Sequence, residues 1–158
     1  MREIILLRHA NAEPALPGQA DIERPLSLRG RAEAEAAGEW LKAHGLKPTR
    51  VLCSPAKRTR ETLERVLGVL GYSDVRYEPR IYDAVPGTLM AVLDEHAEVD
   101  RVLMVGHNPG FEQTAALLHS GSSGEARGMP TAGIAVITLP PGAALEPGIG
   151  TLTRFWWP

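Results

Sequence analysis

Basic and polar residues with catalytic potential stand directly after three short apolar runs of the sequence. They are Arg8 and His9 after the first run, Arg58 shortly beyond the second, and His107 and Asn108 after the third. Guanidinium groups bind phosphoryl oxygens in pairs of hydrogen bonds. Positive neighbours disfavour the imidazolium form of a histidine, which leaves a ring nitrogen free to attack phosphorus. These residue types predict an anion site with a histidine nucleophile.

The three apolar runs are predicted to be strands, over residues 3–7, 50–53 and 101–105. Segments with helical periodicity lie between them, which favours a parallel sheet with crossover helices. The carboxyl ends of parallel strands meet at one edge of a sheet, where ligands bind. We therefore expect a single domain, residues 1–158, folded as a three-layer α/β/α sandwich. Two closing strands, 133–139 and 150–157, are expected to pair antiparallel at one side.

Two predicted helices flank the candidate residues. The first is capped by Ser27 and runs to about His44, with an apolar face expected at Ala32, Ala36 and Trp40, joined by Ala37 and Leu41. The second is expected to start at Ser54-Pro55, with the serine as cap and proline in the first turn. Helix N-termini add N–H donors to an anion site.

Composition narrows the possible classes of function. The 158 residues carry 17 basic and 19 acidic side chains, for a net charge of −2, so no nucleic-acid partner is expected. The apolar runs are too short to span a membrane, and the first one is expected to be a strand rather than a signal peptide. Cys53 is the single cysteine, which excludes an internal disulfide and a thiolate zinc site. We expect a cytoplasmic monomer that needs no cofactor or metal.

Four segments, in order along residues 6–109, resemble one enzyme family. L-L-R-H-A at 6–10 is similar to the Arg-His-Gly signature of the histidine phosphatase superfamily, with Ala10 in place of the usual glycine. R-P-L-S-x-x-G at 24–30 resembles its helix entry, S-P-x-x-R-x-x-x-T at 54–62 its second phosphate-binding segment, and V-G-H-N-P at 105–109 its second catalytic histidine. The resemblance implies the phosphoglycerate-mutase-like fold and is strongest to the short bacterial phosphohistidine phosphatases of the SixA type.

The resemblance also implies roles for individual residues. His9 is expected to be the nucleophile that becomes phosphorylated, while Arg8, Arg58 and His107 hold the phosphoryl oxygens. Arg24 is expected to reach the substrate from the first loop, and Asn108 to offer a further donor. Arg60 is excluded, because on a helix a residue two positions from Arg58 points elsewhere.

The substrate is predicted from the lack of a suitable acid. Family members that cleave phosphate esters place a carboxylic acid near the leaving oxygen; here Asp83 is the one candidate in that region. The imidazole of phosphohistidine leaves without such help. We therefore expect a phosphorylated protein substrate, such as a histidine phosphotransfer domain. The alternatives are a phosphatase for a small phosphate monoester and a non-catalytic phosphate-binding module, whereas a mutase is disfavoured by the short chain.

Overall fold

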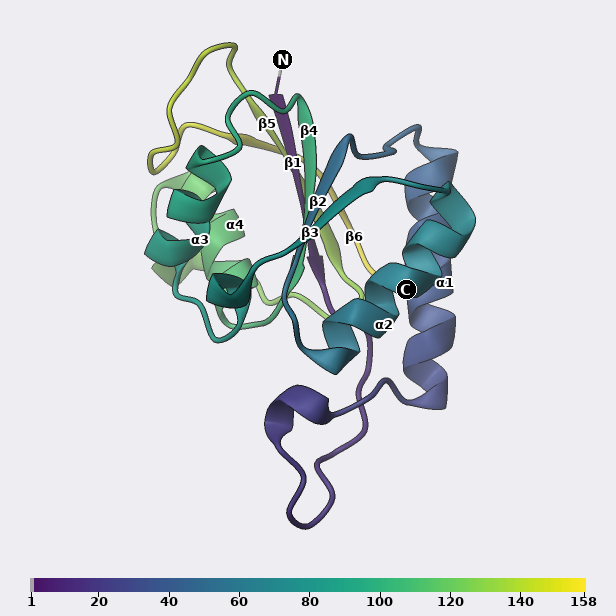
Figure 1. Ribbon diagram of the computed structural model, residues 1–158. Coiled ribbons are helices and arrows are strands. Elements are labelled where there is room, and N and C mark those ends of the chain that lie inside the picture. Colours follow the sequence, from purple (N-terminus) through teal and green to yellow (C-terminus); the bar gives the residue numbers. More distant parts are fainter. Residues whose placement is uncertain (1) are drawn as a thin grey trace.

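The computed structural model describes residues 2–158 and contains one six-stranded sheet (Figure 1). The order of the strands across the sheet is β3-β2-β4-β1-β5-β6. β1 pairs parallel with β4, as β2 does with β4 and β3, whereas β5 and β6 add antiparallel strands on the other side of β1. The strands are β1 (Arg2–Arg8), β2 (Arg50–Cys53), β3 (Asp74–Tyr77), β4 (Arg101–Gly106), β5 (Ile134–Leu139) and β6 (Thr151–Trp156).

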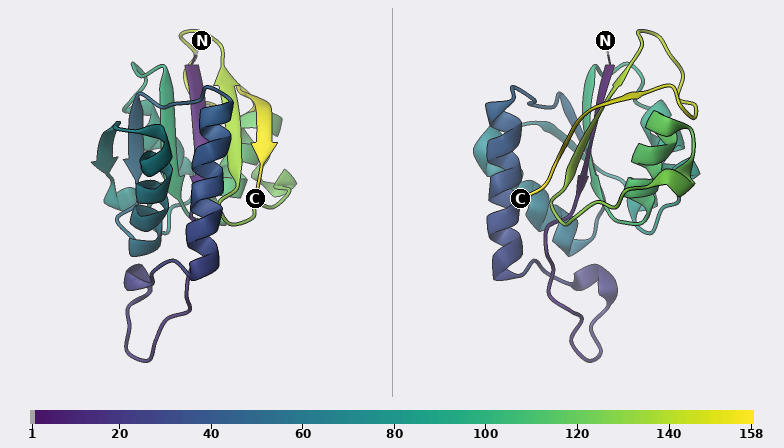
Figure 2. Two further views of the ribbon diagram at one scale, coloured as in Figure 1. Left: turned by 90° about the vertical axis from the view of Figure 1, so that its right-hand side faces the viewer. Right: turned by 180° about the vertical axis from the view of Figure 1, so that it is seen from behind.

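Helices cover both faces of this sheet, as the two views of Figure 2 show. On one face lie α1 and α2, packed side by side, and on the other lie α3 and α4. The α-helices are α1 (Leu28–Ala43), α2 (Lys57–Leu70), α3 (Pro86–Asp94) and α4 (Gly110–Ser120), and the short 3₁₀ turns are η1 (Asp21–Glu23), η2 (Pro79–Ile81) and η3 (Ser123–Glu125). The expected three-layer sandwich with a mostly parallel sheet is confirmed.

The core explains why β1 and β4 form the centre of the sheet. Ile4, Ile5, Leu6 and Leu7 are completely buried, because successive side chains of a strand point to opposite faces and both faces are covered by helices. The even-numbered residues of this run join the cluster beneath α3 and α4, and the odd-numbered ones join the cluster beneath α1 and α2. A rigid central strand therefore delivers Arg8 and His9 to the edge of the sheet.

The apolar face predicted for α1 is partly wrong. Ala32 is exposed, and the buried face consists of Gly30, Ala34, Ala37, Gly38 and Leu41. The buried face of α1 is rotated from the predicted one because α1 packs closely on α2. A Cβ at Gly38 would stand 3.1 Å from the side chain of Val69. A hydrophobicity pattern gives glycine no weight, so it misses a face built on backbone contact.

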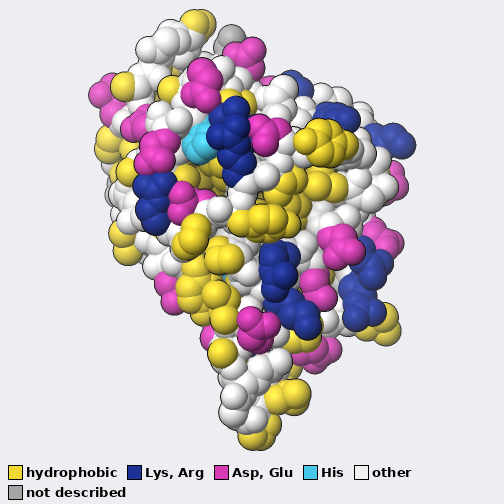
Figure 3. Space-filling view, in the orientation of Figure 1, with side chains coloured by type: hydrophobic (Ala, Val, Ile, Leu, Met, Phe, Trp, Pro, Cys, Tyr) yellow, Lys and Arg dark blue, Asp and Glu magenta, His cyan; other side chains and the backbone are white. Residues whose placement is uncertain are grey.

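The surface shows no concentrated charge on the face displayed in Figure 3, where basic and acidic side chains are interspersed. This matches the near balance of charges in the sequence. Within the described part of the chain, no helix combines the length and apolar character needed to cross a bilayer.

Candidate active site

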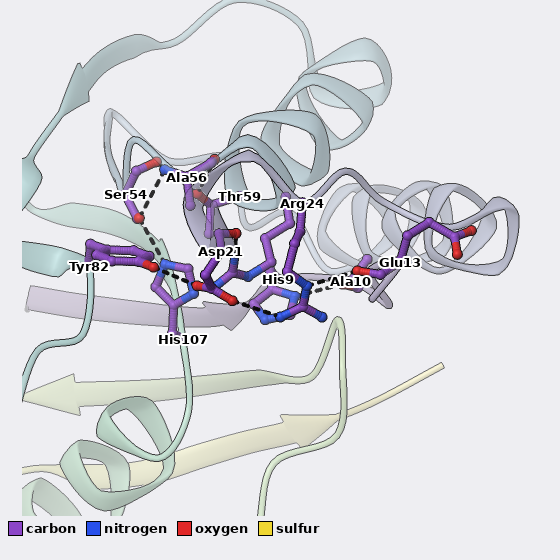
Figure 4. A network of polar contacts seen from close by, with 11 residues as sticks. His9, Ala10, Glu13, Asp21, Arg24, Ser54, Ala56, Thr59, Tyr82 and His107 are labelled. Carbon is purple, nitrogen blue, oxygen red and sulfur yellow. Dashed lines mark hydrogen bonds and ion pairs between the residues drawn. The ribbon is translucent and has the colours of Figure 1, made fainter. Parts of the chain in front are cut away.

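His9, Ser54 and His107 meet at the carboxyl ends of β1, β2 and β4, and Arg24 comes from the loop after β1 (Figure 4). His9 follows β1 and His107 follows β4, and the centroids of their rings lie 5.4 Å apart. The backbone N–H of His9 donates to the Gly106 carbonyl at 2.9 Å, which extends the pairing of the two strands up to the histidines. Gly106 must be glycine, because a Cβ there would meet the ring of Phe111 at 2.5 Å.

His9 presents one ring nitrogen as a free electron pair. Its Nδ1 lies 2.7 Å from the carbonyl oxygen of Ala10, and since a carbonyl can only accept, Nδ1 carries the proton. Nε2 is then the unprotonated nitrogen. Burial, together with the nearby charges of Arg58 and Arg8, lowers the pKa of His9 to about 4 despite the opposing hydrogen bond to Ala10. The imidazole is therefore neutral at pH 7, as a nucleophile requires.

His107 is hydrogen-bonded through Nε2 rather than through Nδ1. Nε2 lies 2.8 Å from the hydroxyl of Ser54, which also accepts from the backbone N–H of Ala56 at 3.3 Å. A hydroxyl can accept two hydrogen bonds and donate one, so it is able to donate to Nε2, and in that arrangement the ring proton resides on Nδ1. Nδ1 is buried and has no hydrogen-bond partner among the described residues. Burial, followed by the influence of His9, lowers the pKa of His107 to about 3.

Ser54 therefore does not act as the predicted helix cap. Helix α2 begins at Lys57 with Ala56 as its N-cap, two residues later than a cap at Ser54 would imply. The helix start is instead held by Thr59, whose hydroxyl lies within hydrogen-bond distance of the carbonyls of Ser54 and Ala56. This frees the Ser54 hydroxyl to orient His107, a role that the sequence pattern did not reveal.

Arg8 and Arg58 each keep one buried donor without a partner in the described chain. Nη1 of Arg8 donates to the Met129 carbonyl at 2.8 Å, and its Nε is unpaired. Arg58 is only 5 % exposed; its two terminal nitrogens bind Asp21, and its Nε is unpaired. Unpaired buried donors are rare and call for an explanation. Together with Nδ1 of His107, they form a set of donors suited to phosphoryl oxygens.

Asp21 occupies a position that the sequence did not predict. Its carboxylate accepts from Arg58 at 2.9 Å and from Arg24 at 3.0 Å, and it also accepts from the hydroxyl of Tyr82. The Tyr82 hydrogen bond is the largest influence on Asp21, followed by that of Arg24, and they hold the pKa of this carboxyl well below its usual range. Figure 4 shows Asp21 between Tyr82 and Arg24, beside both histidines.

The loop that carries Asp21 projects below the sheet in Figure 1. It is closed at its base by an antiparallel bridge between Ala12 and Leu26, and Arg24 donates from Nε to the carbonyl of Glu13. Arg24 thus reaches the site through Asp21, and its charge also depresses the pKa of His9. Gly30 lets α1 approach this loop, because a Cβ there would collide with the carbonyl of Asn11.

Tyr82 is the second group that sequence reasoning missed. Its ring meets the His107 ring edge-to-face at 5.4 Å, and the Arg58 guanidinium lies 5.9 Å from its centroid. Tyr82 comes directly before Asp83, the predicted candidate acid. Asp83 itself is exposed and has a left-handed backbone with φ of 54°. The segment predicted to supply an acid therefore contributes a phenol to the wall of the site.

Asn108 supports the site rather than facing it with a free amide. Its Nδ2 donates to the Met129 carbonyl at 3.0 Å, the same oxygen that binds Arg8, and its Oδ1 accepts from the Glu112 N–H at 3.1 Å. Both ends of the predicted substrate-binding amide are thus engaged inside the protein. Asn108 positions Arg8 and the start of α4.

Other candidate chemistry finds no geometric support in the described residues. Cys53 is fully buried, and burial raises the pKa of its thiol to about 12, so it is no nucleophile. Arg60 is exposed and donates to the Pro55 carbonyl, away from the histidines, as expected. Residues 2–158 contain no group of three or more His, Cys, Asp or Glu side chains placed to hold a metal ion.

Known proteins are similar to this chain in sequence and in fold. Residues 4–98 match the model of the histidine phosphatase superfamily (branch 1). The phosphohistidine phosphatase SixA of Escherichia coli K12 is 31% identical over 87% of this chain and 85% of its own. A structure assigned to SixA from Agrobacterium tumefaciens superposes with a TM-score of 0.87 at 31% identity, covering 99% of this chain and 98% of that one. A SixA protein histidine phosphatase complexed with tungstate gives 0.84 at 29% identity, over 98% and 96% of the two chains.

The family match spans more than half of the chain, and the structure brings His9 and His107 together, with ring centroids 5.4 Å apart. These findings support a hydrolase of the phosphatase type. The chain belongs to the histidine phosphatase superfamily.

Proposed function

We propose that this protein is a metal-independent phosphohistidine phosphatase that works through a phosphorylated His9. The observation that carries the proposal is the set of three buried, unpartnered polar atoms on Arg8, Arg58 and His107. The His107 ring lies 5.4 Å from the His9 ring, and the guanidinium charges of Arg58 and Arg8 lower the pKa of His9. An oxyanion of phosphorus satisfies several such donors at once.

The hydrogen bonds of the two rings give the histidines separate roles in the proposed reaction. The lone pair on Nε2 of His9 forms a bond to phosphorus while the bond to the leaving group breaks, and water later hydrolyses the phosphohistidine formed on His9. Nδ1–H of His107 donates to a phosphoryl oxygen and stabilises its charge in the transition state. The arginines neutralise the remaining charge without being protonated or deprotonated.

The substrate follows from the groups beside the reacting centre. Asp83 is exposed, and Asp21 is held ionised by its partners, so neither serves as a proton donor to an alkoxide. Phosphohistidine does not need that donor. The resemblance to proteins named phosphohistidine phosphatase agrees with this choice, and the tungstate bound by one of them is an oxyanion, as a phosphoryl group is. We infer a phosphorylated protein as substrate, with a histidine phosphotransfer domain as the expected type.

The test compares release of phosphate from a phosphohistidine-bearing protein and from p-nitrophenyl phosphate, with EDTA present. The wild type is expected to prefer the first substrate, His9→Ala to lose both activities, and His44→Ala, which alters an exposed histidine on α1's C-terminal side, to keep them. A preference for p-nitrophenyl phosphate would instead assign the protein to small phosphate monoesters. Activity that survives His9→Ala would refute the nucleophile.

A further inference from the structure

Asp21 is an acidic side chain among the basic groups of the site, and the reaction described above does not use it. A carboxylate has about four lone-pair positions. Arg24 uses one on Oδ1, while Arg58 and Tyr82 use the two on Oδ2. The side chain of Asp21 is still 49% exposed. One acceptor position on Oδ1 therefore remains open to a donor that arrives with the substrate.

The charge of Asp21 makes it selective among leaving groups. As an ionised carboxylate it gives no proton to a departing oxygen, and it repels the negative charge that grows there. It attracts a leaving group that is cationic or carries an N–H donor. A carboxylate at this place therefore works against phosphate esters and in favour of phosphorylated imidazoles.

Phosphohistidine has the donor that Asp21 lacks. When its second ring nitrogen is protonated, attack by Nε2 of His9 forms one P–N bond and breaks another. The electron pair of the broken bond returns to the nitrogen that held phosphorus, and a neutral imidazole departs with its N–H intact. No proton is transferred in the step. Without that proton the leaving group would be an imidazolate anion, which is far less stable.

We propose that the open oxygen of Asp21 accepts the N–H of the leaving imidazole and thereby determines the preference of this site for P–N over P–O bonds. The inference rests on the proposed function and adds the residue that selects its substrate class. Arg24 and Arg58 hold the carboxylate in place from the loop and from α2, and Tyr82 holds it from the segment after η2. Figure 4 shows the carboxylate beside both histidines.

The hydrogen bond between Asp21 and the leaving imidazole also predicts how activity depends on pH. The groups that face Asp21 are two guanidinium cations, the Tyr82 phenol, whose pKa is raised, and His107, whose pKa is lowered to about 3. None of them is expected to change charge near neutrality, whereas the imidazole of the substrate does. Asp21 favours the protonated form of that ring, so it extends activity on phosphorylated imidazoles to higher pH.

The experiment measures kcat/KM on 1-phosphoimidazole and on p-nitrophenyl phosphate across pH 6 to 9. Asp21→Asn is expected to lower kcat/KM on 1-phosphoimidazole by about 10- to 100-fold, the effect of losing a hydrogen bond between charged groups. Its kcat/KM on p-nitrophenyl phosphate should fall much less, so that the ratio of the two kcat/KM values shifts toward p-nitrophenyl phosphate. The decline of kcat/KM on 1-phosphoimidazole at alkaline pH should also begin at a lower pH in this variant. Glu23→Gln removes one negative charge from the same 3₁₀ turn and should leave both substrates within about twofold.

Different failures have different meanings. An equal loss on both substrates would show that Asp21 only positions Arg58, and no change on either would show that it contacts neither; both results overturn the inference but leave the phosphohistidine phosphatase standing. A wild type active on p-nitrophenyl phosphate but inactive on 1-phosphoimidazole would overturn the proposed function itself. Asp21→Glu keeps the charge and should keep the preference, which separates loss of charge from a folding defect.

Discussion

Replacing Ser54 with alanine tests whether the hydroxyl fixes the proton of His107. The hydroxyl lies 2.8 Å from Nε2, and both groups are buried. After Ser54→Ala, either Nε2 is left as a buried acceptor without a donor, or the proton moves from Nδ1 to Nε2. In the second case Nδ1 presents a lone pair, rather than a donor, to the phosphoryl group. Either outcome costs the transition state about 1–3 kcal/mol, the penalty of an unmade buried hydrogen bond.

That penalty corresponds to a loss of about 5- to 150-fold in kcat/KM. The assay is hydrolysis of p-nitrophenyl phosphate, combined with ¹⁵N chemical shifts of the His107 ring to report its tautomer. Thr59→Val is the matched control, because it removes a neighbouring buried hydroxyl that binds the backbone carbonyls of Ser54 and Ala56. It should lower the free energy of unfolding by about 1 kcal/mol and leave kcat/KM within about twofold. An Nε2–H tautomer in the wild type, or a Ser54→Ala enzyme of normal activity, would refute this reasoning.

Three further changes test the remaining parts of the site. His107 has a pKa of about 3 in the fold, whereas a histidine of the unfolded chain is protonated near pH 6.5. The free energy of unfolding should therefore fall as the pH drops below 6.5, by about 2–3 kcal/mol at pH 4.5. Urea unfolding of His107→Gln should show a weaker dependence on pH. Arg58→Lys should reduce kcat/KM at least about tenfold, because lysine lacks the planar set of donors, whereas Arg60→Lys should have no effect in the same assay. Gly30→Ala should lower the thermal unfolding midpoint by several degrees, since its Cβ collides with the loop backbone, and an unchanged midpoint would contradict that packing.

The sequence predicts the parts of the site that depend on regular structure. Strands buried on both faces are recognisable as short apolar runs, and topology then brings their ends together, so the placement of His9, Arg8 and His107 follows from local pattern. Helical spacing also separates Arg58 from its exposed neighbour Arg60. These steps need only periodicity and the rule that ligands bind beyond the carboxyl ends of parallel strands.

The sequence does not predict the contacts that loops make with one another. Asp21 and Tyr82 are 61 residues apart, and each lies in a segment without periodicity. The loop around Asp21 contains other acidic residues, and nothing in their spacing singles one out. The available clue is Arg24, three residues later, because side chains at that spacing are neighbours on a helical turn and can form an ion pair. Ser54 is predicted to be a helix cap for a similar reason: the sequence shows the residue type but not that a distant histidine binds this hydroxyl.

The charge balance of the site explains why a carboxylate is tolerated there. With both histidines neutral at pH 7, Asp21 offsets one of the three guanidinium charges of Arg8, Arg24 and Arg58, and the charges of Glu112 and Glu33 act on Arg8 as well. A phosphate group carries a charge of about −1.5 to −2 at this pH, so part of the positive charge that would bind the product is already compensated. A site with three uncompensated cations would hold inorganic phosphate more tightly and release it more slowly.

Asp21→Asn should therefore bind inorganic phosphate more tightly than the wild type. One charge at a contact distance, allowing for the solvent exposure of Asp21, is worth about 1–2 kcal/mol, or about 5- to 30-fold in the inhibition constant. The measurement is inhibition of p-nitrophenyl phosphate hydrolysis by phosphate at low and high salt, and the difference should shrink as salt increases. Weaker inhibition in the variant would mean that the carboxylate serves chiefly to hold Arg58 in its binding geometry, and the charge balance would then not be what governs product release.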